Sequence, residues 1–265
     1  IPGCEASGIV EKIGNNVKDF QVGERVTFCT REYRAYATHI NISQDKVIKI
    51  PNFLSDELVA TNFLRALTVE MLINRITSVD SSKSILVTAA SGGVGRLLCQ
   101  WANSMGVKVI GSVGSQEKIE ETKLNGCIET FVSSDNKFSE KVLDVTNGKG
   151  VDIVFDSVGN DTFEASLSSL AHCGYLINFG QSSGPVQPVL MSTLAEKSLS
   201  ICRPILFHYF GDRRNYENMA ASVFKAFEDE IIKVSEFLPF DLKDASRAHD
   251  TLESRKGGGS IYLIP

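Results

Sequence analysis

The sequence contains no Cys-x-x-Cys pair, although it holds six cysteines, and its four histidines are also scattered. A structural zinc site takes four Cys or His ligands at close spacing, and a catalytic site takes three protein ligands. The spacing therefore argues against bound zinc. In a chain of 265 residues, dispersed cysteines are typical of reduced, mostly buried thiols, so we expect a cytoplasmic protein. There is also no Ser/His/Asp set or nucleophile elbow, and each histidine is more readily explained as structural than as catalytic.

An excess of positive charge and long apolar runs are missing as well. The chain has 27 Lys and Arg against 32 Asp and Glu, a formal net charge of −5. This balance gives no broad basic surface for nucleic acid or for anionic membranes. No apolar run spans a bilayer, and no signal peptide is recognisable. The chain starts at Ile1 without methionine, inside what reads as a domain, so we expect further residues upstream.

A strand, a glycine-rich turn and a helix follow one another in the middle of the chain. The apolar run 85–90 is short and partly β-branched, as a buried parallel strand is, and helical spacing begins after the turn. The turn, Ala-Ser-Gly-Gly-Val-Gly, fits Gly-x-Gly-x-x-Gly with Ala90 in the first place. Small residues at Gly92 and Gly93 let a pyrophosphate reach the helix N-terminus, and Gly95 lets helix and strand pack closely. A turn with chance glycines is the alternative, but the second strand that follows favours a dinucleotide site.

The end of the second strand, 107–113, lacks the acidic residue that binds the ribose of NAD, about twenty residues after the glycines. Gly114 and Ser115 follow the strand instead, and Lys118 comes one turn later. An acid would repel a 2′-phosphate, whereas hydroxyls, amides and a lysine attract it. The sequence thus favours NADPH. A solvated surface lysine is the alternative for Lys118, and its position after the strand decides against that reading.

The order of elements predicts an α/β fold. Residues 1–50 are rich in short alternating segments and turns, typical of an antiparallel, barrel-like β domain; we expect strands at 7–13, 26–29, 33–40 and 46–50. Residues 54–72 read as one or two helices. From Ser84 onward strands and helices alternate, which predicts a doubly wound parallel six-stranded Rossmann sheet. Its expected strands are 85–90, 107–113, 130–132, 151–156, 175–180 and 198–202, and its expected helices are 94–105, 116–125, 137–147, 161–171 and 192–197.

Residues beyond Pro204 break this alternation. We expect helices at 216–230 and 244–255 and a last strand at 261–264, which has no parallel partner in view and should rejoin the opening β domain. Within the Rossmann part, ligands bind at the carboxyl ends of strands. Asp156 ends the fourth strand, and we favour a helix-capping role for it over a binding role.

Several segments in order resemble the zinc-independent NADPH:quinone oxidoreductases of the medium-chain dehydrogenase/reductase superfamily. They are Gly-Cys-Glu-Ala-Ser-Gly-Ile-Val, Val-Gly-Glu-Arg-Val, Ala-Ala-Ser-Gly-Gly-Val-Gly, Val-Phe-Asp-Ser-Val-Gly, Asn-Phe-Gly-Gln-Ser-Ser-Gly and the closing Leu-Glu-Ser-Arg with Leu-Ile-Pro. The resemblance spans the whole chain. It implies a GroES-like β-barrel catalytic domain, incomplete at its N-terminus, from 1–66 and 205–265, and an NADP-binding Rossmann domain from 67–204. It also implies a homodimer.

The resemblance assigns site residues by position. Gly92, Gly93 and Val94 fall at the pyrophosphate; Thr68, as the catalytic-site residue, faces the nicotinamide amide. The other implied cofactor contacts are Met71, Gly114, Ser115, Lys118, Ser133, Ser157, Phe179, Gly180, Gln181, Ser182 and Arg255. Arg255 is expected to join Lys118 at the 2′-phosphate, with a surface arginine as the alternative.

Three positions depart from the family or its relatives. Ser133 replaces an aromatic or histidine phosphate contact, and Met71 replaces a tyrosine near the cofactor. Cys4 stands where zinc-dependent relatives carry a zinc-binding histidine, so we expect it to be a packed thiol.

The implied activity is hydride transfer from NADPH to a quinone, with the protein positioning the reactants. Two alternatives stay open: reduction of the C=C bond of α,β-unsaturated carbonyls, and a cofactor-binding protein with little turnover, as in relatives that resemble crystallins or bind RNA. The acidic charge balance argues against RNA.

Overall fold

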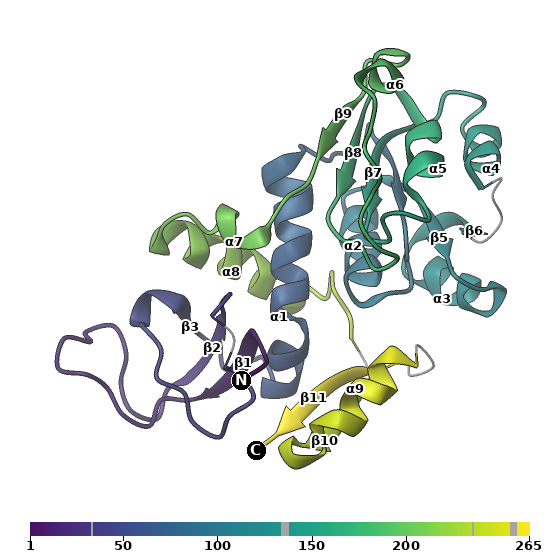
Figure 1. Ribbon diagram of the computed structural model, residues 1–265. Coiled ribbons are helices and arrows are strands. Elements are labelled where there is room, and N and C mark those ends of the chain that lie inside the picture. Colours follow the sequence, from purple (N-terminus) through teal and green to yellow (C-terminus); the bar gives the residue numbers. More distant parts are fainter. Residues whose placement is uncertain (33, 134–137, 235, 255–258) are drawn as a thin grey trace. The chain divides into compact units, whose positions relative to one another are not determined.

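The computed structural model describes residues 1–32, 34–133, 138–234, 236–254 and 259–265. They form two compact units, one of residues 1–70 with 209–265 and the other of residues 71–208 (Figure 1). Each unit has its own β-structure, a six-stranded sheet in 71–208 and two smaller sheets in the other unit.

The unit of residues 71–208 is built on one parallel sheet, which confirms the predicted fold class. The strand order is β6-β5-β4-β7-β8-β9, and all neighbouring strands are parallel. This is the order of two mononucleotide-binding halves that meet between β4 and β7. The strands are β4 (Ser84–Val87), β5 (Lys108–Val113), β6 (Cys127–Val132), β7 (Val151–Asp156), β8 (Leu170–Asn178) and β9 (Ser200–Cys202).

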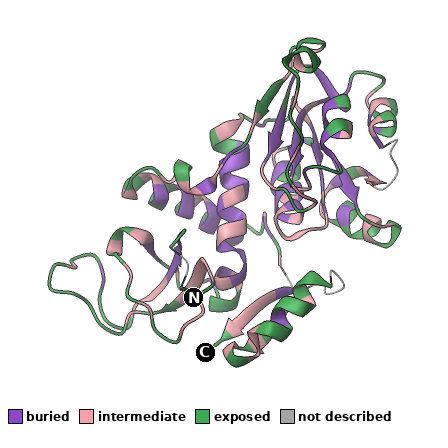
Figure 2. Cartoon of the chain, viewed as in Figure 1, coloured by how far each residue is buried: buried purple, intermediate pink, exposed green. Residues whose placement is uncertain are grey.

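Helices connect the consecutive strands of this sheet. They are α2 (Gly93–Ser104), α3 (Ile119–Leu124), α4 (Phe138–Val145), α5 (Phe163–Ser168) and α6 (Met191–Ala195). A 3₁₀ turn, η3 (Gln116–Lys118), precedes α3, and a π-helical segment, η2 (Met71–Ile76), opens the unit. Strands β4, β5 and β7 are almost wholly buried (Figure 2), as their continuous apolar sequences require.

Many boundaries differ by a few residues from the sequence-based expectation; the strand expected at 7–13, for example, is observed at Glu5–Ile9. Two of the differences have a cause in the backbone or in strand pairing. The strand expected at 85–90 ends at Val87, because Ala89 takes a positive φ of 49° and turns the chain. The helix expected at 161–171 ends at Ser168, and residues 170–171 instead open β8, where Leu170 pairs with Val151.

The other unit contains a three-stranded antiparallel sheet, β1 (Glu5–Ile9), β2 (Arg25–Cys29) and β3 (Val47–Lys49), with a 3₁₀ turn, η1 (Gln44–Lys46), before β3. The strand expected at 33–40 is wrong for residues 34–40, and Tyr33 lies outside the described residues. The backbone N–H groups of Arg34, Ala35 and Tyr36 bond instead to carbonyls of residues 1–3, which ties this segment to the first residues of the structure.

Two long helices pack together in this unit. Helix α1 (Asp56–Glu70) lies against α8 (Arg213–Glu228), where the rings of Phe63 and Phe224 stack at 5.5 Å. A short helix, α7 (Leu206–Tyr209), marks the passage of the chain from the other unit.

The last strand, β11 (Ser260–Ile264), has a partner that the sequence analysis missed. It pairs in parallel with β10 (Phe237–Asp241), and the 3₁₀ turn η4 (Leu242–Asp244) and helix α9 (Ala245–Glu253) follow β10. The expectation of no parallel partner was therefore wrong, although β11 does lie in the same compact unit as the opening strands. None of the described helices has the length and apolar character needed to cross a bilayer.

Candidate functional site

The glycine-rich turn between β4 and α2 requires glycine for packing as well as for access. A Cβ atom on Gly95 would lie 2.2 Å from the carbonyl oxygen of Ala89, so no side chain fits there. Gly92 is the N-cap residue, and its N–H bonds to the Ala89 carbonyl at 2.8 Å. The first turn of α2 contains no acidic residue. Its N–H groups therefore offer an anion site at the carboxyl end of β4.

Asp156, at the end of β7, links this strand end to the end of β4 and to the turn before α5. It is fully buried and accepts hydrogen bonds from the Thr88 hydroxyl (3.0 Å) and the Thr162 hydroxyl (2.9 Å). It also accepts from the N–H groups of Val158 (2.8 Å) and Gly159 (3.2 Å). Thr162, not Asp156, is the N-cap residue of α5. Asp156 thus holds the turn that precedes the helix, which is a structural role close to the capping role expected.

The end of β5 offers small and polar groups. Gly114 is exposed with open space around its Cα, and Lys118 is half-buried on η3. The Ser115 hydroxyl donates to Glu117 Oε1 at 3.1 Å, an acid that the sequence analysis did not weigh. Ser133 lies beside this end, but its N–H and hydroxyl both bond to the Val113 carbonyl, at 2.8 and 3.1 Å.

The end of β8 approaches the end of β7 closely. A Cβ on Gly180 would lie 2.6 Å from the Ser157 carbonyl oxygen, and the Ser182 N–H bonds to that oxygen at 3.3 Å. Phe179 N–H bonds to the Asp156 carbonyl at 2.8 Å. The structure therefore brings Ser157 together with the segment 179–182, two groups that the sequence had assigned to one cofactor.

Asn178 is the residue of this region that sequence reasoning missed. Its side chain is 3% exposed, and neither its Nδ2 nor its Oδ1 has a hydrogen-bond partner among the described residues. A buried amide with no partner costs free energy unless something else satisfies it. Its place at the carboxyl end of β8 was the one signal available in the sequence.

Two other expected site residues, Thr68 and Met71, have other surroundings in the structure, and a third, Arg255, is not described. Thr68 belongs to the other unit, on α1, where its hydroxyl donates to the Leu64 carbonyl at 2.9 Å. Met71 is the first residue of η2 and is 1% exposed, so its side chain is buried in the protein interior. Arg255 lies outside the described residues.

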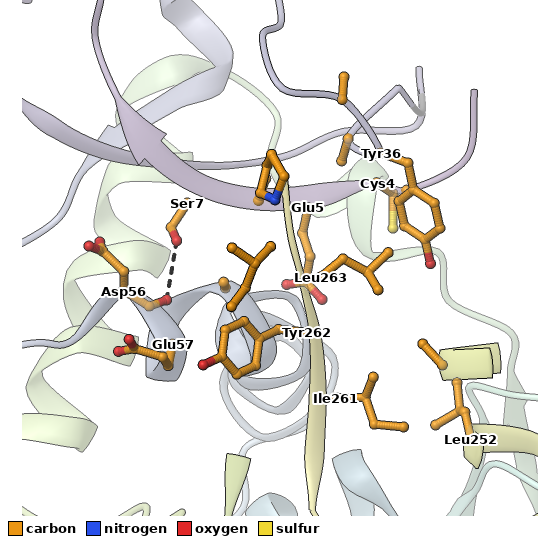
Figure 3. Close-up of a pocket in the computed structure, with 18 of the residues that line it drawn as sticks. Cys4, Glu5, Ser7, Tyr36, Asp56, Glu57, Leu252, Ile261, Tyr262 and Leu263 are labelled. Atoms are coloured by element: carbon orange, nitrogen blue, oxygen red, sulfur yellow. Dashed lines mark hydrogen bonds between the residues drawn. The ribbon is translucent and has the colours of Figure 1, made fainter. Parts of the chain in front are cut away.

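A groove of about 470 Å³ runs through the unit of residues 1–70 and 209–265, between β1, α9 and β11 (Figure 3). Tyr36 and His249 meet at its wall, where the phenol oxygen lies 2.8 Å from His249 Nε2. Cys4 also lines the groove and is half-buried, and burial raises the pKa of its thiol. Within the described ranges, no cluster of three His, Cys, Asp or Glu residues is arranged to hold a metal.

Glu5 is the perturbed acid of this groove. Its side chain extends from β1 toward α1 (Figure 3), where Oε2 accepts the Leu64 N–H at 2.8 Å. Burial raises the pKa of Glu5 to about 7, against the opposing effects of that hydrogen bond and of the Arg65 charge.

Two family profiles match the chain. Residues 1–52 match the alcohol dehydrogenase GroES-like domain, and residues 93–225 match the zinc-binding dehydrogenases. The quinone oxidoreductase of Salmonella typhimurium is 40% identical over an alignment that covers 99% of this chain and 81% of the relative. The 2-haloacrylate reductase of a Burkholderia species is 35% identical, covering 100% of this chain and 81% of the relative.

Solved structures agree with these matches. The Escherichia coli quinone oxidoreductase, solved as a complex with NADPH, is 38% identical and superposes with a TM-score of 0.94, covering 100% of this chain and 82% of that one. The solved 2-haloacrylate reductase superposes with a TM-score of 0.93 at 35% identity, covering 100% of this chain and 84% of that one.

Proposed function

This chain belongs to the quinone oxidoreductase family of the medium-chain dehydrogenases/reductases, and from that premise we propose that it transfers a hydride from NADPH to quinones. The observation that carries the proposal is the combination of two features. One is the similarity, at 38% identity, to a quinone oxidoreductase solved with NADPH. The other is an end of β5 without its own carboxylate, followed by Lys118.

The residues of the 71–208 unit fit NADPH. Gly92, Gly93 and Val94 would hold the pyrophosphate at the first turn of α2, which has no acidic residue to repel it. Ser115 and Lys118 would hold the 2′-phosphate, provided that the Ser115 hydroxyl leaves Glu117. The unpartnered amide of Asn178 has one donor group and one acceptor, which match those of a nicotinamide carboxamide.

When bound, NADPH supplies the hydride, so the residues of this chain have to position the reactants and exclude water. The backbone at Gly180 packs closely against that of Ser157, which brings the ends of β7 and β8 together with little side-chain bulk at their contact. Thr68 already donates its hydroxyl hydrogen to the Leu64 carbonyl, so this hydroxyl offers lone pairs to an amide N–H and is a poor proton donor. The one proton that completes the hydroquinone after hydride transfer then comes from water or from another side chain.

Two finer features belong to the same proposal. Hydride transfer to an electron-poor acceptor needs no Lewis acid, and Cys4 replaces the histidine that zinc-dependent relatives use, so the enzyme is proposed to act without zinc. It is also proposed to be a cytoplasmic homodimer, by resemblance to its family.

A second activity has specific support. The 2-haloacrylate reductase is 35% identical over the whole chain, and its name describes reduction of an electron-poor alkene acid. Steady-state assays with matched panels of quinones and α,β-unsaturated carbonyls separate the two. Higher kcat/KM for the enone panel would overturn the quinone assignment, and no turnover on either panel would favour a binding protein.

The cofactor is tested by comparing the Kd of NADPH and NADH for three proteins. Lys118→Ala should weaken NADPH by about 10-fold or more, the value of a charge-assisted hydrogen bond, and leave NADH unchanged. Glu117→Gln is the matched neighbour and should strengthen NADPH, because it removes a negative charge beside Ser115. An equal loss of both cofactors in Lys118→Ala would show that this lysine does not read the 2′-phosphate.

A further inference from the structure

Two cysteines of the Rossmann unit meet inside the protein, far from each other in sequence. Cys99 lies on α2 and Cys127 begins β6, and their sulfur atoms are 3.5 Å apart, with the Cys127 thiol donating to the Cys99 sulfur. Both are free thiols and both are buried, at 0% and 5% exposure. We propose that this pair is a redox-active dithiol, which a hydroperoxide oxidises to a disulfide joining α2 to β6.

The surroundings hold the two sulfur atoms close together. Gln100 Nε2 donates to Asn125 Oδ1 at 2.6 Å, which ties α2 to the turn before β6. Gly126 takes a φ of +95° in that turn, and a Cβ there would lie 2.5 Å from the Asn103 side chain of α2. The helix and the turn that leads into the strand are therefore packed together next to the cysteine pair. A disulfide needs an S–S distance of about 2.05 Å, so closure requires a shift of roughly 1.5 Å.

The two thiols are not equivalent. Once Cys127 is deprotonated, its sulfur can accept a hydrogen bond from the Cys99 thiol 3.5 Å away, and Thr130 and Thr122 stabilise the same sulfur, so the pKa of Cys127 is lowered. The same hydrogen bond, together with burial, raises the pKa of Cys99. A thiolate reacts faster with peroxide than a thiol does. Cys127 is therefore the sulfur that is oxidised first, and Cys99 is the resolving thiol.

Cys127 is also the better placed of the two for access. It is the first residue of β6, which is an edge strand of the sheet and is covered by α3. Strand ends and short helices open locally at lower free-energy cost than the middle of a sheet. Cys99 lies in the interior of a 12-residue helix and has no comparable route to solvent.

The chemistry balances with hydrogen peroxide as the oxidant. Cys127 attacks one peroxide oxygen, which gives a sulfenic acid and one water molecule. The Cys99 sulfur then attacks the sulfenic sulfur and displaces hydroxide. The hydroxide takes up the proton of the Cys99 thiol and leaves as a second water molecule. The two sulfur atoms lose two electrons in total, and peroxide takes up both.

The test uses the folded protein in a Cys173→Ser background, because Cys173 is an exposed thiol. The reduced protein is treated with hydrogen peroxide, denatured with N-ethylmaleimide present, and digested for mass spectrometry. We expect more than half of the molecules to carry a Cys99–Cys127 cross-linked peptide, two hydrogens lighter than the reduced pair. The cross-link should revert with dithiothreitol and should lose its preference over other cysteine pairs when oxidation is done in guanidinium.

Two variants assign the roles. Cys99→Ala should leave Cys127 as a sulfenic or sulfinic acid, heavier by one or two oxygens, and Cys127→Ala should leave Cys99 unmodified. The peroxide dose is calibrated on the wild type, in which it must oxidise Cys173. The proposal is overturned if Cys99 and Cys127 of the folded protein are both fully alkylated after that dose. Frequent cross-links from Cys127 to any other cysteine would overturn it too. These readouts need no catalytic turnover, and the cross-link map of the protein with both cysteines decides the matter even where a variant fails to fold.

Discussion

The buried carboxyl of Glu5 should make the stability of its unit depend on pH. The pKa of Glu5 is raised to about 7 in the folded protein, whereas an unperturbed glutamate titrates near 4.3. The folded state therefore binds this proton more tightly than the unfolded state does. The contribution of Glu5 protonation to the free energy of unfolding is complete below the pKa of Glu5 in the unfolded state. It is lost as the pH rises through the pKa of Glu5 in the folded state.

The size of the effect follows from the shift. Each pKa unit corresponds to about 1.4 kcal/mol, so the free energy of unfolding should fall by about 3 kcal/mol between roughly pH 4.5 and pH 7.5. Burial is the largest cause of the shift, and the Leu64 N–H and Arg65 only reduce it. Replacing Glu5 by glutamine keeps the shape and a hydrogen-bond acceptor for Leu64 but removes the ionisation.

Urea denaturation followed by circular dichroism, repeated from pH 5 to pH 8.5, measures this difference. Wild type and Glu5→Gln should have similar stability at pH 5, and the variant should become the more stable one by a few kcal/mol at pH 8. Glu236→Gln, an exposed glutamate of the same unit, is the control and should follow the wild type. Parallel pH profiles for wild type and Glu5→Gln would refute the reasoning, because they would mean that Glu5 titrates alike in both states.

Two substitutions test the architecture of the nucleotide unit, both by chemical or thermal denaturation. Gly95→Ala places a methyl group 2.2 Å from the Ala89 carbonyl and should cost about 1–3 kcal/mol as well as dinucleotide affinity; Gly114→Ala, with open space around it, should leave stability unchanged. Asp156→Asn turns an amide N–H toward donors that now point at a carboxylate and should cost about 2–4 kcal/mol. Asp161→Asn, an exposed neighbour, should change stability by less than about 0.5 kcal/mol, and equal losses in the two variants would contradict the role given to Asp156.

The parallel sheet was predictable because local and periodic signals agree along it. The glycine turn, the change from strand to helix spacing and the repeated alternation all point to one fold. The boundaries were less predictable. Cys173 takes a φ of 60° inside β8, and the register of β8 on β7 shifts between Val151 and Ile153. Neither irregularity has a signature in the sequence.

The missed features depend on contacts between distant residues. Strand β10 was overlooked because it contains Pro239, a residue that usually argues against a strand. It is compatible here because β10 pairs on one side only, with β11. The segment at Tyr36 reads as a strand by composition, yet its phenol is fixed by His249, 213 residues further along the chain. No local pattern encodes such a pairing.

The nucleotide site proposed here is made mostly of backbone, and this explains what the sequence could and could not specify about it. The Thr88 hydroxyl bonds to Asp156 and accepts the Ser157 N–H at 3.0 Å, so the ends of β4 and β7 are held as one rigid piece. Glycines at 92, 95 and 180 then allow close approach, and their pattern was visible in the sequence. In the proposed site, few side chains remain to discriminate between ligands, chiefly Lys118 and Asn178. A difference in cofactor or acceptor preference between this chain and its relatives should therefore trace to these few side chains, because the backbone cradle distinguishes neither a 2′-phosphate from a hydroxyl nor one flat acceptor from another.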